Sequence, residues 1–454
     1  MRGGTALLSS LVALSVRASP EQIHVSYTGN ARELALDFVA STQSPAFVTV
    51  RNFNGKETRV NTTSFHFPQI GYMHQALLSF PGISGGASAS YIITADGAPS
   101  EAFSVTPELA HPERFAVFGD FGLVNDVCME DLTAQAKAGA YDSVLHVGDC
   151  AWGHPPATLP LPLLRPTPAT PPTPSLPLHP ATPPPPAVAY DFEDLFSVQG
   201  NLFMSLVQGY GATHPVMPAE GNHEACSTCG DVPELPNSGL NFTQYKGRFH
   251  AVELYAGANS GSNSNRYYSF ERGLAHFVVL TAEAYLYART PAFLANQLAW
   301  LKADLAAVDR KRTPWLVVLA HKDWTMATEA FADFQPLLDA AKADVLFCGH
   351  VHYYNRYMPY DSVTGEVDTA SVSADGATYT EPKYMTVIVT GASGDIEADD
   401  KYVKESPSFT GTENYGWGVF TALNATHATW DFHTVKADNG PGDYLDHLTI
   451  IRTH

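Results

Sequence analysis

The sequence predicts an α/β domain preceded by a small antiparallel β-sandwich. Three observations lead to this fold class. From Glu113 onward, apolar runs of roughly four to eight residues, most of them stopped by glycine, alternate with amphipathic helical segments. Before that point, short alternating segments are separated by clusters of Gly, Asn, Pro and Ser. The chain has 454 residues and 45% apolar content, so it can bury the cores of two or three domains.

The first 18 residues predict a cleaved secretory signal peptide. Arg2 precedes an apolar stretch at residues 6–16, and small residues follow up to Ala18. A buried N-terminal helix is the alternative. This stretch is too short to span a bilayer, and no other apolar run reaches the roughly 20 residues that a spanning helix needs. We therefore expect a secreted protein with no membrane span. Glycosylation sequons at Asn61, Asn241 and Asn424 agree with secretion.

Residues 20–108 are expected to form the small sandwich. Its predicted strands share an alternation of apolar and polar side chains with Gly, Asn, Pro or Ser between them. They lie at residues 23–27, 47–51, 64–67, 75–80 and 90–94. No candidate site residue falls in this part of the chain.

Residues 112–454 are expected to form the α/β domain. Its apolar runs predict buried strands at residues 114–118, 143–147, 214–219, 315–320, 344–348 and 384–390. Helical periodicity predicts helices at residues 125–137, 293–308 and 331–341. Sites in α/β sheets form just beyond the carboxyl ends of strands, so the residues that follow these six runs are the candidates for function.

Five of the six strand ends carry side chains that bind metals. They are Asp120, Asp149, Asn222, His321, and the pair His350 and His352. The sixth end, Gly391 to Gly394, carries no ligand. Asp, Asn and His in this number suit two divalent or trivalent cations held side by side.

Asp149 is the predicted bridging ligand, because a carboxylate offers one oxygen to each ion. One ion would bind Asp120 and His352, and the other Asn222, His321 and His350. Neutral imidazoles and a carboxamide leave the ions strongly Lewis acidic, so that a hydroxide held on them attacks phosphorus in line. His223 has no metal role in this scheme and is the candidate to bind phosphate or to protonate the leaving oxygen.

Taken in order, these motifs resemble a known family. They are Gly119-Asp120-Phe121-Gly122, Gly148-Asp149, Gly221-Asn222-His223-Glu224, His321 and Gly349-His350-Val351-His352. The set resembles the calcineurin-like metallophosphoesterases, and more closely the purple acid phosphatases. Residues 20–26 resemble the start of that family's N-terminal fibronectin-like domain, and residues 415–418 with 424–427 resemble its C-terminal region.

The resemblance implies a metallophosphoesterase α/β sandwich after a fibronectin-III-like β-sandwich. It implies Fe(III) paired with Fe(II), Zn(II) or Mn(II), and hydrolysis of phosphate monoesters at acidic pH by a secreted, vacuolar or lysosomal enzyme. It leaves a homodimer open. A phosphodiesterase or nucleotide pyrophosphatase of the same superfamily would share the ligands, so this alternative stays open, as does a catalytically impaired metal-binding form.

The second motif departs from the family's Gly-Asp-x-x-Tyr, in which the tyrosine binds Fe(III). Trp152 stands at the tyrosine position, and an indole has no lone pair for a metal. A proline-rich insertion at residues 151–188 follows, with 15 prolines after Trp152. Removing it restores Gly-Asp-Cys-Ala-Tyr, with Tyr190 as the ligand. Either the insertion loops out, or it is a retained intron, which the unbroken restored motif favours. Tyr190 is the predicted ligand in both cases.

Charge narrows the range of partners. The net charge of −20 argues against nucleic acid and anionic membranes, so small phosphate esters are the expected substrates. The metal pair would supply the local positive charge that binds them. Plant members of the family carry substrate histidines after the ligand corresponding to His321. This chain has Lys322 there, a candidate phosphate contact, and no histidine before His350.

Overall fold

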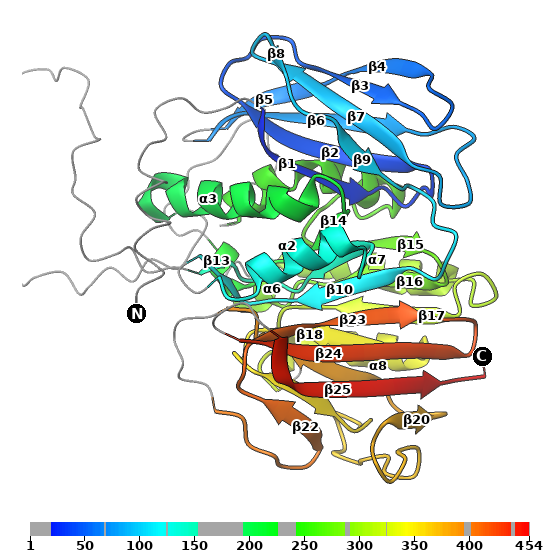
Figure 1. Cartoon of the computed structure of the whole chain (residues 1–454). Helices are drawn as coiled ribbons and strands as arrows, with labels where there is room; N and C mark the ends of the chain where they lie inside the picture. Colours follow the sequence, from blue (N-terminus) through cyan, green and yellow to red (C-terminus); the bar gives the residue numbers. More distant parts are fainter. Residues whose placement is uncertain are drawn as a thin grey trace, which may run out of the picture.

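The computed structural model describes residues 20–67, 70–123, 126–152, 194–225, 242–286, 291–323, 325–394, 401–436 and 441–453. The predicted signal peptide and nearly all of the proline-rich insertion lie outside these residues. In Figure 1 the N-terminal sheets, in blue, lie above a larger α/β part. Within the described residues, no helix combines the length and apolar character that crossing a membrane requires.

The N-terminal part is built from two antiparallel sheets. One has the order β1 (Glu21–Tyr27), β2 (Glu33–Ala40), β6 (Gly71–Ser79) and β5 (Thr63–Phe67). The other has the order β4 (Glu57–Asn61), β3 (Phe47–Arg51), β7 (Ala89–Ala95) and β8 (Ala98–Pro99), and β9 (Phe103–Val105) also pairs with β7. Val25, Leu36, Val48 and Tyr91 from both sheets are fully buried in one core. The arrangement is consistent with a β-sandwich, and the boundary at residues 20–108 stays a prediction.

Four of these strands escaped the sequence analysis: β2, β4, and the very short β8 and β9. The two longer ones did so for different physical reasons. β2 is buried at every position after Glu33, so it lacks alternation. It lies between β1 and β6, and its Asp37 accepts a hydrogen bond from the backbone N–H of Ala251 in α5 (His250–Val252) at 3.0 Å. β4 lies at the edge of its sheet and is almost wholly exposed, so it has no apolar pattern.

The α/β part contains two seven-stranded sheets. The first has the order β14 (Val216–Pro218), β12 (Ser143–His146), β10 (Arg114–Phe118), β23 (Gly416–Ala422), β24 (His427–Val435), β25 (Pro441–Ile451) and β20 (Thr378–Thr380). The second has the order β15 (Tyr268–Arg272), β16 (Ala275–Val279), β17 (Trp315–Leu319), β18 (Val345–Cys348), β21 (Thr386–Thr390), β19 (Tyr354–Tyr357) and β22 (Ser408–Thr412). Facing aromatic rings join the two sheets. The ring centres of Phe115 and Phe277 lie 4.7 Å apart, and those of Phe347 and Trp430 lie 5.0 Å apart.

Helices pack against both sheets. Trp300 and Leu301 of α7 (Pro291–Ala307), with Phe331 and Phe334 of α8 (Thr328–Ala340), share a core with the second sheet. On the other side, α2 (Met129–Ala138) and α3 (Asp194–Gly211) contact each other, and α3 also lies along β1 (Figure 1). The shorter elements are β11 (Phe121–Gly122), β13 (Cys150–Trp152), η1 (Asn222–Glu224), α4 (Thr243–Arg248), η2 (Glu253–Gly257) and α6 (Glu283–Leu286). The predicted α/β sandwich is therefore confirmed.

The sequence analysis predicted α2, α7 and α8 but not α3. Gly200 and Gly209 lie inside α3, and glycine lowers helix propensity by about 1 kcal/mol per residue. Packing against β1 and α2 stabilises this helix in spite of its sequence.

All six predicted strands of the α/β part are present, and their directions bring the strand ends together. β10, β12 and β14 run parallel to one another in the first sheet. β17, β18 and β21 run parallel in the second. The carboxyl ends of parallel strands meet at one edge of a sheet, so the polar clusters that follow them can share a site.

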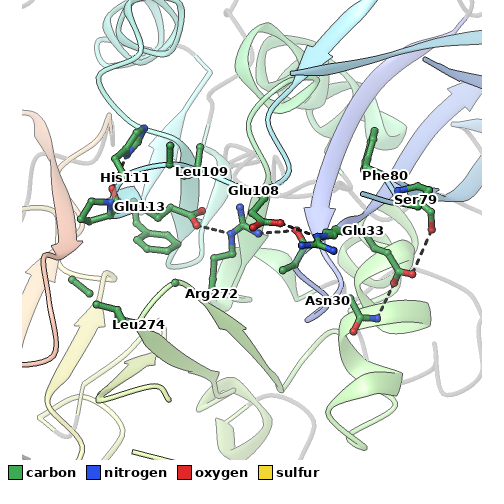
Figure 2. Close-up of a pocket in the computed structure, with 18 residues that line it drawn as sticks. Asn30, Glu33, Ser79, Phe80, Glu108, Leu109, His111, Glu113, Arg272 and Leu274 are labelled. Carbon is green, nitrogen blue, oxygen red and sulfur yellow. Dashed lines mark hydrogen bonds and ion pairs between the residues drawn. The ribbon is translucent and has the colours of Figure 1, made fainter. Parts of the chain in front are cut away.

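A cavity of about 940 Å³ lies at the opposite, amino ends of β10 and β16, between the N-terminal sheets and the α/β part. Figure 2 shows Arg272 directed at Glu113 in its wall. The Arg272 Nε atom lies 2.5 Å from Glu113 Oε2, and Tyr27 donates its hydroxyl hydrogen to Glu113 Oε1. The guanidinium also stacks on the Tyr27 ring, with its carbon 4.4 Å from the ring centre. This buried network joins β1 to both sheets of the α/β part.

We expect Arg272→Met to lower the stability to urea by about 3–5 kcal/mol, because it leaves the Glu113 carboxylate buried without its countercharge. Lys383→Met is the control, since its ion pair with Glu366 is more than half exposed and solvent screens it. Urea unfolding followed by fluorescence measures both variants. Equal midpoints for the two variants would contradict the structural role of the network.

Candidate metal centre

The backbone turns sharply where three predicted ligands follow their strands. Asp120, Asp149 and His350 adopt the left-handed region, with φ of 57°, 52° and 74°. Such a backbone costs roughly 1–3 kcal/mol at a residue other than glycine, so it persists only where the surroundings hold it. Two of these positions follow strands of the first sheet, β10 and β12, and the third follows β18 of the second, so both sheets contribute such a turn.

Each aspartate holds the loop that carries other candidate residues. Asp120 Oδ2 accepts the backbone N–H of His350 at 2.9 Å, and Asp149 Oδ1 accepts the backbone N–H of His223 at 2.9 Å. The second oxygen of each aspartate faces imidazole nitrogens. Asp120 Oδ1 lies 3.6 Å from His352 Nε2, and Asp149 Oδ2 lies 3.0 Å from His321 Nε2. One oxygen of each carboxylate thus fixes the backbone while the other is directed into the site.

His321 is fully buried, and its ring orientation is fixed from behind. Its Nδ1 atom lies 2.9 Å from the carbonyl oxygen of Val147, and a carbonyl can only accept a hydrogen bond. Nδ1 therefore donates to Val147, and Nε2 faces Asp149 and Asn222. A hydrogen bond to the nitrogen remote from the metal is the usual arrangement for a metal-ligating histidine.

Three potential ligand atoms converge in consequence. His321 Nε2 lies 3.0 Å from Asp149 Oδ2 and 3.1 Å from Asn222 Oδ1. Each of these three atoms can bind a metal ion, and Lys322 Nζ also donates a hydrogen bond to Asn222 Oδ1. His350 joins the group, because one ligand atom each of Asp149, His321 and His350 lie within 4.8 Å of one another. The donor set of nitrogen and oxygen atoms fits iron, zinc or manganese.

Burial and nearby charges keep His350 neutral and Asp149 ionised. Burial, together with His321 and Lys322 nearby, lowers the pKa of His350 to about 2. Burial alone would raise the pKa of Asp149, but His321 and His223 outweigh it and hold that pKa well below its usual range. A neutral imidazole and a carboxylate are the protonation states that bind a metal.

Glu224 ties two strand-end loops together, a role that the sequence analysis missed. Its buried carboxylate accepts three backbone N–H groups: Asp149 at 2.9 Å, Cys150 at 2.6 Å and Gly221 at 2.6 Å. The residue was visible within the Gly-Asn-His-Glu motif, but two of its three partners, Asp149 and Cys150, are about 75 positions away, so nothing local pointed to them.

Two glycines of the strand ends are required by close packing. A Cβ atom at Gly221 would overlap the Asp149 carboxylate, and one at Gly391 would lie 2.7 Å from Asp120 Oδ2. The sixth strand end, which carries no ligand, therefore forms the wall against which the Asp120 carboxylate packs.

The remaining candidates divide into those described and those outside the structure. The His223 side chain is 17% exposed, and its Nε2 lies 3.9 Å from Asp149 Oδ2. Tyr190 and Asn241 lie outside the described residues. Lys322, the candidate phosphate contact, is 3% exposed and has other partners, Glu283 and Asn222.

Comparison with known proteins agrees with this geometry. Residues 113–354, more than half of the chain, match the calcineurin-like phosphoesterase family. The chain belongs to this family. Residues 384–444 match the iron/zinc purple acid phosphatase-like protein C family, so the resemblance to purple acid phosphatases drawn from the motifs is confirmed.

Named relatives span most of the chain. It is 28% identical to purple acid phosphatase 18 of Arabidopsis thaliana, over 91% of this chain and 81% of the relative. It is 22% identical to acid phosphatase type 7 of Danio rerio, over 96% of this chain and 92% of the relative. The structure of purple acid phosphatase PPD1 from yellow lupin superposes with a TM-score of 0.70 at 17% identity, covering 95% of this chain and 74% of the lupin chain, and shows the same fold.

We expect Gly221→Ala to displace the Asp149 carboxylate and to reduce the bound metal to less than half of the parent value. Overpacking of this kind also costs about 1–3 kcal/mol of stability. Gly209→Ala in α3 is the control, because its Cβ would meet Thr133 at an ordinary 3.4 Å. Elemental analysis of the purified proteins gives the metal content. Retention of full metal by Gly221→Ala would show that Asp149 is not a ligand.

Proposed function

We propose that the chain is an acid phosphatase that hydrolyses phosphate monoesters at a dinuclear metal centre. The observation that carries this proposal is the convergence of three ligand atoms at the strand ends: His321 Nε2 lies 3.0 Å from Asp149 Oδ2 and 3.1 Å from Asn222 Oδ1. The names of its relatives, purple acid phosphatase 18 and acid phosphatase type 7, support the choice of reaction.

Asp149 is the proposed bridge between two ions, one of them Fe(III) and the other Fe(II), Zn(II) or Mn(II). Asn222, His321 and His350 would hold one ion; Asp120, His352 and Tyr190 would hold the other. When bound, the ions supply Lewis acidity toward the phosphate oxygens and lower the pKa of a water molecule that attacks phosphorus. Asp120 and Asp149 each bind a backbone N–H with one oxygen, which leaves the other oxygen directed into this centre.

His223 is the proposed acid or phosphate-binding group. Its backbone N–H donates to Asp149 Oδ1, and this bond holds the His223 backbone beside the proposed bridging carboxylate. The side chain is partly exposed, unlike the wholly buried His321, and a group that meets substrate needs that access. From this position it would bind the phosphate or give a proton to the leaving oxygen.

Secretion is part of the same proposal. We infer a signal peptide at residues 1–18 and delivery to the exterior, the vacuole or the lysosome. Asn61 and Asn424 are exposed, as glycosylation requires, while Asn241 lies outside the described residues. The small β-sandwich at residues 20–108 is the proposed fibronectin-like domain, and residues 112–454 are the proposed catalytic domain.

The function and the tyrosine ligand can be tested with three proteins: the full chain, the chain without residues 151–188, and that shortened chain carrying Tyr190→Phe. We expect the shortened chain to bind two metal ions, to absorb in the visible through the Fe(III)-phenolate bond, and to hydrolyse p-nitrophenyl phosphate near pH 5. Tyr190→Phe should remove the visible band. Metal analysis, absorption spectra and initial rates measure the three outcomes.

The result for the full chain separates the two explanations of the insertion. Equal colour and activity in the full and shortened chains mean that the insertion loops out and that Tyr190 still reaches the iron. Faster hydrolysis of bis(p-nitrophenyl) phosphate than of the monoester would replace the phosphatase by a phosphodiesterase. Fewer than two metal ions in every form would overturn the dinuclear proposal.

A further inference from the structure

A buried lysine lies directly behind one of the proposed metal ligands. Lys322 follows His321 at the end of β17 and is 3% exposed. Its Nζ atom lies 2.6 Å from Asn222 Oδ1 and 2.8 Å from each oxygen of Glu283. Glu283 begins α6, just after β16, and is fully buried. Three separate segments of the chain therefore meet at one ammonium group.

Such a pair is a costly way to stabilise a fold. Removing two charges from water costs several kcal/mol per ion, and replacing a buried pair by apolar residues is often neutral or stabilising. Burial raises the pKa of Glu283, and Lys322 and His321 oppose that rise. A buried pair in contact with a ligand side chain therefore calls for a functional explanation.

The chemistry of the ammonium group supplies that explanation. A lysine ammonium has three donors and no acceptor, so it can approach the oxygen of the Asn222 amide but not its NH₂ group. The oxygen so selected is the atom that lies 3.1 Å from His321 Nε2. Without this contact the amide could rotate by 180° and present hydrogens, which bind no cation.

We propose that Lys322, held by Glu283, is a positioning residue that fixes the Asn222 amide with its oxygen toward the metal. The inference rests on the metal centre of the proposed function. Glu283 has two effects in it: it fixes the lysine side chain, and its charge offsets the ammonium, so that a lysine can lie beside a cation site without adding net positive charge. Lys322 acts through Asn222 rather than on the substrate.

The test uses a double variant, Lys322→Met with Glu283→Leu, in the full chain. A single change at either position would alter the net charge next to the cation, and that charge alone would change metal affinity. The double variant leaves the net charge unchanged while it removes the ion pair and the contact to the amide. Zinc(II) is loaded into each protein and withdrawn with increasing chelator, which gives an affinity for each of the two sites without any activity measurement.

We expect one zinc site of the double variant to bind about 10–100-fold more weakly, the usual effect of losing a group that orients a metal ligand. The other site should keep its affinity, and the thermal midpoint should stay within a few degrees of the parent. Lys322→Met with Glu283→Gln, which keeps more of the original volume, provides the same comparison if the first variant does not fold. Lys322→Arg retains the donors and should restore most of the affinity.

Two control proteins separate the inference from the metal centre itself. Asn222→Leu removes the proposed ligand and should abolish zinc binding at the site that the double variant weakens. Arg356→Met with Asp446→Leu removes a buried ion pair, with Nε and Oδ2 2.7 Å apart, that contacts no proposed ligand; it should keep both zinc affinities. If Asn222→Leu loses a site while the Lys322 and Glu283 variants bind like the parent, the positioning role is wrong and the metal centre stands. If neither the full chain nor the chain without residues 151–188 binds two zinc ions, both the metal centre and the inference are wrong.

Discussion

The site depends on the different contacts that the two oxygens of each aspartate carboxylate make. Asp120 and Asp149 each give one oxygen to a backbone N–H of a neighbouring loop and direct the other into the site. The Asp120 bond joins the loop after β10 of the first sheet to the loop after β18 of the second, so it fixes the distance between the sheets where the ligands meet. The Asp149 bond joins the loops after β12 and β14 within the first sheet. The left-handed backbone at both aspartates is tolerated because these bonds hold it.

Further buried groups hold the site residues in position. Glu224 binds the backbone on either side of Asp149, and Val147 fixes the His321 ring through its carbonyl oxygen. Behind Asn222 lies the pair of Lys322 and Glu283. Most of these partners are fully buried, so the orientation of the site is determined by groups that no substrate reaches.

Local chemistry decided which of these features the sequence could predict. A buried strand followed by glycine and a metal-binding side chain is a pattern confined to a few residues, so Asp120, Asp149, His321 and His350 could be proposed from sequence, and the structure places their strands as expected. Glu224 and Glu283 were missed because the partners Asp149 and Cys150 of the first and Lys322 of the second lie tens of positions away. β2 lost its alternation through burial on both faces, and α3 depends on packing that overrides its glycines.

The network of Tyr27, Glu113 and Arg272 bears on how this protein can be cut or recombined. The buried ion pair of Glu113 and Arg272 joins the start of the α/β part to its second sheet, and Tyr27 of β1 donates a hydrogen bond to the same carboxylate. A fragment starting after residue 112 would lose Tyr27 and expose a surface evolved to be covered, and a transplanted N-terminal sandwich would need a matching acid and base in its new host. The β-sandwich is therefore a poor candidate for exchange between proteins as a free-standing module, and changes on either side of this boundary should be inherited together.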